Sequence, residues 1–138
     1  MDRGTKIYAL FLAFLGLLVL VWWALSYNPR IGELNDLLAS DPKVASYPYR
    51  FHVIDIQNRT ALISTPRSSD VPVIRFIGII YPRLVNARQD DPEVVKAQQE
   101  LVEVQKRVAK LVQEQPDITG VRWRLDKDWW AARGVMIN

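Results

Sequence analysis

The sequence contains no cysteine and only one histidine, His52, among its 138 residues. Without cysteine the chain cannot form disulfide bonds, thiolate metal sites or a cysteine nucleophile. A zinc site with a single histidine would need carboxylates for nearly all of its other ligands. These absences exclude thiol chemistry and argue against a zinc centre, and they are compatible with an oxidising compartment.

A strong excess of either charge is also missing. The net charge is +3, and sixteen basic and fourteen acidic side chains remain after residue 27. This balance, with no basic cluster, argues against nucleic-acid binding, because phosphate contacts require concentrated lysine and arginine. No internal repeat or low-complexity segment is visible, and residues 28–138 are enough for one small domain.

One long apolar run dominates the N-terminal part of the chain. Residues 7–25 (IYALFLAFLGLLVLVWWAL) carry no charge and contain a single glycine, Gly16. As a helix these nineteen residues would reach about 28 Å, close to the ~30 Å hydrocarbon thickness of a bilayer. Aromatic residues suited to the headgroup level flank the run, namely Tyr8, Trp22, Trp23 and Tyr27. The sequence therefore predicts a cytoplasmic stub and transmembrane anchor over residues 1–27.

A cleaved signal peptide is the alternative interpretation of the same run. Ala24 and Ser26 could supply the small residues before a cut at Tyr27. However, the run exceeds the ~7–15 apolar residues of a signal peptide, and two tryptophans crowd the cleavage position. We therefore favour an uncleaved anchor.

The flanking charges predict the orientation of this anchor. Arg3, Lys6 and the amino terminus precede it, whereas only Arg30 lies among the fifteen residues that follow. Because positive charge tends to stay in the cytoplasm, the N-terminus is predicted to lie inside. Residues 28–138 would then form an extracytoplasmic domain on the inner (plasma) membrane, which in a bacterium faces the periplasm.

The first half of this domain reads as a helix, a hairpin and a further strand. Asn28-Pro29 can cap a short helix that ends near Ser40. The apolar stripe of this helix either packs on the core, which we favour, or touches lipid. Residues 49–56 and 61–65 alternate as in a β-hairpin. The very hydrophobic residues 71–81 (VPVIRFIGIIY) predict an inner strand, which the domain's own helix or a partner must cover.

The second half predicts a long helix followed by a strand. Asp91 and Pro92 favour a helix start, and an apolar stripe recurs to residue 115 at a width typical of packing on a sheet rather than in a coiled coil. Residues 118–125 alternate as a strand. The fold class is therefore α+β: one transmembrane helix, then a small α/β sandwich of order α-β-β-β-α-β, with a mixed or antiparallel sheet packed on helix 92–115.

Three segments of this order resemble the BON domain, an envelope-associated α/β module. They are residues 37–42 (LLASDP), 58–64 (NRTALIS) and 117–123 (DITGVRW), which fall in the first helix, the hairpin and the final helix-to-strand passage. Two features depart from the family: Arg59 stands where its hairpin glycine is expected, and residues 65–91 are an insertion. The resemblance implies phospholipid contact or envelope protein assembly, and it carries over no catalytic residue.

Residue patterns for catalysis are weak. His52 lies in an alternating strand, where a hydrogen-bonded structural role is favoured over general-base work. Asp90-Asp91 is explained by helix capping, and we expect Asp55 to form a structural ion pair with a base such as Arg75. The sequence therefore predicts a protein that is not an enzyme, with no catalytic residue, metal site, cofactor or small-molecule substrate.

Two binding hypotheses remain. In the first, the domain contacts anionic phospholipid headgroups or an envelope protein; its predicted contact residues are Arg122, Arg124, Lys127, Trp129 and Trp130, with one tryptophan entering the lipid. In the second, the chain is an accessory or assembly subunit of an inner-membrane complex. Its anchor would then pack through Ala9, Ala13 and Gly16, and residues 71–81 or the tryptophan tail would contact the partner.

Overall fold

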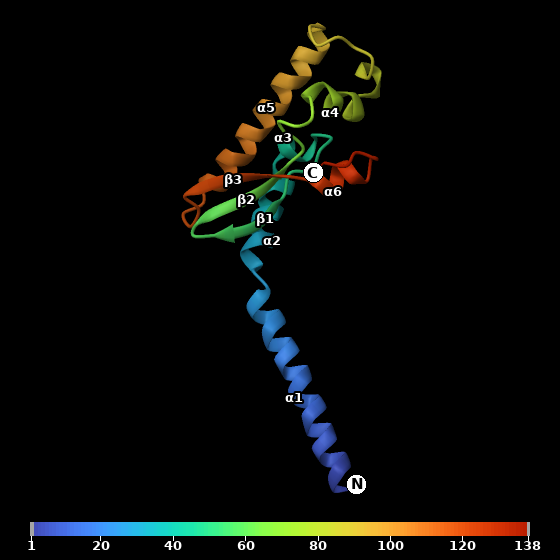
Figure 1. The fold of residues 1–138 in the computed structure, drawn as a ribbon. Helices are drawn as coiled ribbons and strands as arrows, with labels where there is room; N and C mark the ends of the chain where they lie inside the picture. The colour runs from blue at the N-terminus through green and yellow to red at the C-terminus, as the bar shows by residue number, and fades with distance from the viewer. Residues whose placement is uncertain (1, 138) are drawn as a thin grey trace.

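The computed structural model describes residues 2–137, which form one long helix and a small mixed α+β domain (Figure 1). Helix α1 (Arg3–Ser26) projects from the domain, and none of its residues is buried. The remaining elements are α2 (Pro29–Ser40), α3 (Pro42–Ala45), β1 (Val53–Gln57), β2 (Thr60–Thr65), α4 (Val73–Ile80), η1 (Pro82–Leu84), α5 (Pro92–Gln113), β3 (Gly120–Leu125) and α6 (Lys127–Ala131).

The three strands form a mixed sheet in the order β1-β2-β3. Strands β1 and β2 are an antiparallel hairpin with Gln57 opposite Thr60, and a register shift falls between Val53 and Asp55. Strand β3 lies parallel to β2, from Thr60 opposite Gly120 to Thr65 opposite Leu125. The parallel pairing requires a long crossover, which α4, η1 and α5 provide.

Helices α2 and α5 begin where their capping residues predict. The side-chain oxygen of Asn28 accepts from the backbone N–H of Arg30 at 3.0 Å, and that of Asp91 accepts from the N–H of Glu93 at 2.9 Å. Each helix then has proline in its first turn. Both helices match the sequence prediction, since these contacts satisfy N–H groups that have no partner within the helix.

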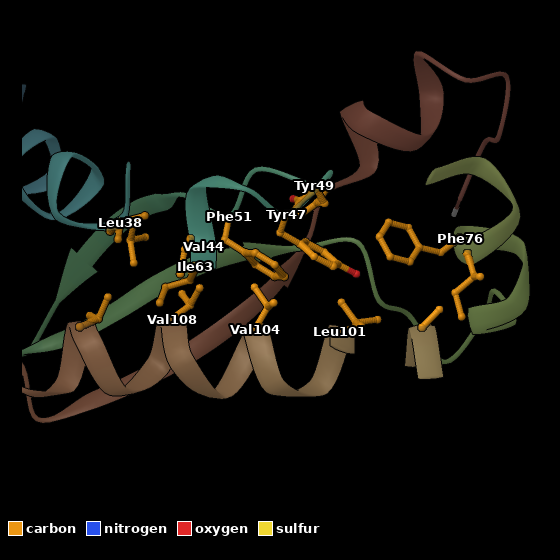
Figure 2. Packing of buried hydrophobic residues seen from close by; sticks show 14 of the residues in the cluster. Leu38, Val44, Tyr47, Tyr49, Phe51, Ile63, Phe76, Leu101, Val104 and Val108 are labelled. Atoms are coloured by element: carbon orange, nitrogen blue, oxygen red, sulfur yellow. The ribbon is translucent and has the colours of Figure 1, made fainter. Parts of the chain in front are cut away.

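The core fills the space between α5, α2 and the sheet, as Figure 2 shows. One stripe of α5 is buried along its whole length: Val94, Ala97, Leu101, Val104, Val108 and Val112. Leu34 and Leu38 of α2 join the same cluster, so the stripe of α2 packs on the core, which was the favoured prediction. Along α5 the core changes from aliphatic near Leu38 and Val108 to aromatic near Tyr49 and Phe76 (Figure 2).

The predicted inner strand over residues 71–81 is wrong, because this segment forms helix α4. Phe76 and Ile77 are buried and Arg75 is exposed, so the run has the one-sided burial of an amphipathic helix. An apolar run of this length does not distinguish a strand from a helix by composition alone. The domain order after α1 is therefore two helices, two strands, the helices α4, η1 and α5, a strand and a final helix, with three strands among residues 2–137.

Candidate binding surface

The predicted membrane-anchor residues all lie on or next to α1. Exposed side chains there include Tyr8, Trp22, Trp23 and Tyr27, the last being the residue that caps the helix end. The rings of Trp23 and Tyr27 stack with centroids 5.7 Å apart. Nothing lies within 4 Å of a Cβ added at Gly16, so the small-residue face is uncovered. By length and composition α1 can cross a membrane, and its mean hydropathy reaches 2.4.

Arg30 joins α2 to the loop that follows α5. Its guanidinium donates to both carboxylate oxygens of Asp117 at 2.9 Å, to Gln115 Oε1 at 2.9 Å and to Glu33 Oε2 at 2.9 Å. The hydrogen bonds from Arg30 hold the pKa of the Asp117 carboxyl below its ordinary value. Only Tyr27 and Asn28 separate α1 from α2, so the domain lies close to the helix end.

Arg59 makes a second connection to the same loop. Its guanidinium donates to the carbonyl oxygens of Pro116 at 2.8 Å and Asp117 at 3.5 Å, while its own carbonyl accepts from the N–H of Thr119 at 2.8 Å. Both hairpin-turn residues have positive φ, 50° at Asn58 and 62° at Arg59. This is the conformation of a two-residue hairpin turn in which glycine is usual, and Arg59 adopts it while tied to its neighbours.

The predicted basic contact residues are exposed and close together along the chain. Arg122 and Arg124 lie on β3, and Lys127 starts α6. None of the three forms an ion pair within residues 2–137. Val121 and Leu125, at the alternate positions of β3, pack on the core, so the arginines point to the opposite face of the sheet. Their charges are therefore free to attract an anionic group.

The two tryptophans predicted as contacts differ in burial. Trp130 is 1% exposed and donates from Nε1 to the carbonyl oxygen of Pro66 at 2.9 Å. Trp129 is half-buried, packs edge-on against Trp130 at 5.0 Å, and is covered by the guanidinium of Arg133 at 3.9 Å. Trp130 is thus unavailable for lipid contact in this fold. Both adjacent residues contact the core because the chain forms helix α6 there.

His52 belongs to a small polar cluster beside α6. Its Nδ1 lies 2.9 Å from Ser64 Oγ, and its backbone N–H donates to the same hydroxyl at 3.1 Å. Asp126 instead accepts from the hydroxyl of Tyr49 at 2.8 Å, and burial raises the pKa of Tyr49. His52, Ser64 and Asp126 border a hollow of about 470 Å³ together with Arg124 and Lys127. Ser64 is 1% exposed and His52 has no carboxylate partner in the described chain, so the contacts are those of a structural cluster.

The expected ion pair between Asp55 and Arg75 does not form. The Asp55 carboxylate accepts from the backbone N–H of Ile56 at 2.8 Å and from Gln57 Nε2 at 3.0 Å. Arg75 lies on α4 rather than on a neighbouring strand. The error follows from the wrong assignment of residues 71–81, since only a strand there would have placed Arg75 beside β1. Across residues 2–137, no three His, Asp or Glu side chains converge as a metal site.

Sequence reasoning missed a basic groove on the other side of β3. A hollow of about 700 Å³ lies between β3, α5 and the loop after β2, and its lining includes Arg67, Lys106 and Trp123. These residues are far apart in the sequence, and only the parallel placement of β3 brings them together. No known protein family, curated protein or solved structure matches the chain.

Proposed function

We propose that this chain is a single-pass protein of the inner membrane whose domain is a non-catalytic binding module. The observation that carries the proposal is the junction between α1 and α2. Only two residues connect α1, which is long enough to span a bilayer, to the domain. Arg30, two residues after this connection, is bound to Asp117 in the loop after α5. The domain therefore binds any ligand beside the membrane. With α1 in the orientation favoured by Arg3 and Lys6, the domain faces the periplasm.

The proposed binding surface is the basic part of β3 and α6, comprising Arg122, Arg124 and Lys127. These exposed cations have no ion-pair partner within the described residues, and a positive surface favours an anionic partner. An envelope protein is the favoured partner. The resemblance of residues 37–42, 58–64 and 117–123 to BON domains, which are associated with envelope assembly, points to the same kind of partner.

Anionic lipid headgroups are the second candidate ligand, because basic side chains beside a bilayer attract them at about 1 kcal/mol per residue. The burial of Trp130 counts against this alternative, since it removes an aromatic anchor that was expected to enter the lipid. Arg122 and Arg124 would then have to act through charge alone.

The experiment is site-specific photo-crosslinking of the full chain in its native membrane. A photoreactive amino acid replaces Arg124, and a matched control variant carries it at Lys96, an exposed position on α5. We expect a covalent protein adduct from position 124 and none from position 96. Lipid adducts alone at position 124 would favour the headgroup alternative, and equal adducts or none at both positions would refute the proposed surface.

The absence of cysteine allows the membrane side to be tested on the same chain. Single cysteines at exposed Ser69 and at Thr5 are treated with a membrane-impermeant maleimide in spheroplasts. We expect Ser69→Cys to be labelled and Thr5→Cys to be protected until the membrane is permeabilised. The reverse pattern would place the domain in the cytoplasm and contradict the proposed orientation.

A further inference from the structure

We propose that β3 accepts an extended acidic segment of a partner protein as a fourth strand of the sheet. The inference rests on the proposed binding function and names the chemistry of the ligand and the way it is held. In strand addition, backbone hydrogen bonds supply affinity, and side chains on alternate faces supply specificity. Strand β3 has a free edge and basic side chains on both sides of it.

The two edges of the sheet differ in what occupies them. At the β1 edge, Asn35 of α2 uses its side chain like a neighbouring strand: its Oδ1 accepts from the Val53 N–H at 2.6 Å and its Nδ2 donates to the Val53 carbonyl at 3.2 Å. At the opposite edge, β3 pairs with β2 and with no other strand of residues 2–137. A six-residue strand edge is therefore open to backbone pairing.

The groove of about 700 Å³ runs beside this edge, between β3, α5 and the loop after β2. Arg67 and Lys106 are its charged lining residues, and none of the residues that border it within the described chain is acidic. Val73, Val102 and the 39% exposed Trp123 supply apolar contact. Side chains on this face of an added strand would therefore contact the positive charges of Arg67 and Lys106 and the apolar side chains between them.

The other face of β3 is also positive. Arg122 and Arg124 project there, on the face opposite to that of Trp123. An added strand would place its remaining side chains beside these two arginines, because directly opposed residues on neighbouring strands lie on the same face. Acidic residues on both faces of the added strand would therefore pair with Arg122 and Arg124 on one face, and with Arg67 and Lys106 on the other.

The same charges disfavour a second copy of this chain as the occupant. Consider an antiparallel pairing of two β3 strands with their sheets facing the same way. Centring the pairing on Arg122 opposes Arg122 to its own copy, and centring it on Arg124 opposes Arg124 to its own copy. Centring on Trp123 opposes Arg122 to Arg124. Like charges placed directly opposite are destabilising, so self-pairing is unfavourable in every central register.

The test uses the full chain in nanodiscs of zwitterionic lipid and a fluorescent hexapeptide, Glu-Glu-Thr-Val-Glu-Glu, followed by anisotropy. The peptide matches the length of β3 and places acids on both faces. We expect saturable binding that weakens at least about tenfold in Arg122→Glu/Arg124→Glu, since this change replaces attraction by repulsion. The control Arg88→Glu/Lys96→Glu makes the same change of charge at exposed positions away from β3, and it should leave binding unchanged.

Two further peptides test the charge attraction and the backbone pairing separately. A Lys-Lys-Thr-Val-Lys-Lys peptide should bind the Arg122→Glu/Arg124→Glu variant better than the original chain. N-methylation of alternate peptide amides on the pairing edge should abolish binding, because it removes the donors needed for a strand ladder. Binding that survives methylation, or no binding of the acidic peptide, would overturn strand addition. A protein adduct at position 124 would still stand in that case, so failure of this inference is distinguishable from failure of the proposed function.

Discussion

Two parts of the domain are closed by different interactions: the near end, beside α1, and the far end, where α4 meets α6 (Figure 1). At the far end, Phe76 of α4 meets Trp129 and Trp130 of α6, with ring centroids 5.4 and 6.4 Å apart. At the near end, Arg30 and Arg59 reach the loop after α5 by hydrogen bonds and an ion pair that stay partly in solvent.

The two ends therefore differ in how much their contacts contribute to the stability of the domain. Burial of a large aromatic side chain is worth several kcal/mol, whereas an exposed ion pair contributes about 0–1 kcal/mol. Each buried ring of the far end therefore contributes more to the free energy of unfolding than an exposed ion pair of the near end does. The near end, where Arg30 and Arg59 join α2 and the hairpin to the loop after α5, can be altered at small cost to stability.

The largest effect is expected at Trp130. Trp130→Ala removes a fully buried ring and leaves the carbonyl oxygen of Pro66 without its indole donor, so the free energy of unfolding should fall by about 3–5 kcal/mol. Urea unfolding of the full chain in detergent, followed by circular dichroism, measures the change. Trp22→Ala on the exposed α1 is the matched control and should leave the unfolding of the domain unchanged. Equal losses in both variants would contradict the comparison.

A smaller, pH-dependent effect is expected between the two ends, where Asp41 joins α3 to α5. Its carboxylate accepts from Arg107 at 2.7 Å, and this hydrogen bond lowers the pKa of Asp41 in the folded chain. A depressed pKa stabilises the fold above the unfolded value near 3.8, and that contribution is lost as pH falls through the folded pKa. Asp41→Asn should therefore cost about 1–2 kcal/mol at pH 7.

Unfolding at acidic pH tests whether the charge of Asp41 causes this loss of stability. Urea midpoints of the original chain and of Asp41→Asn, measured from pH 7 to pH 2, should converge as Asp41 becomes protonated. Glu93→Gln is the control, since the Glu93 carboxylate lies in an exposed pair with Arg83 at 3.4 Å. A gap that stays constant across this pH range would mean that the Asp41 charge is not the source of the difference.

Much of this architecture follows from local sequence signals. Proline and a capping residue at the start of α2 and α5, and the regular stripe from Val94 to Val108, specify helices without reference to the rest of the chain. The alternation in β3 likewise specifies a strand. These signals succeed because each depends on neighbours within one turn or one strand.

Features that depend on distant contacts were not predictable in the same way. Residues 73–80 are rich in β-branched side chains, yet they become α4 because burial of Phe76 and Ile77 on one side outweighs strand preference. The basic groove pairs Lys106 of α5 with Arg67 from the loop after β2, and no local pattern links them. The alternation of residues 118–125 was enough to predict that Arg122 and Arg124 share one face of β3, whereas the groove could not be predicted.

The smallest effect is expected at Arg59, where the near end combines an unfavourable backbone conformation with favourable side-chain contacts. Arg59→Ala keeps the positive φ of 62° but loses the hydrogen bonds to Pro116 and Asp117, whereas Arg59→Gly loses the same bonds and removes the conformational cost. The glycine variant should therefore be more stable than the alanine variant by about 1 kcal/mol. Thermal unfolding of both variants in detergent measures this difference. An alanine variant as stable as the glycine variant would show that the turn relaxes to another conformation, and the near end would then tolerate change even more readily than its contacts imply.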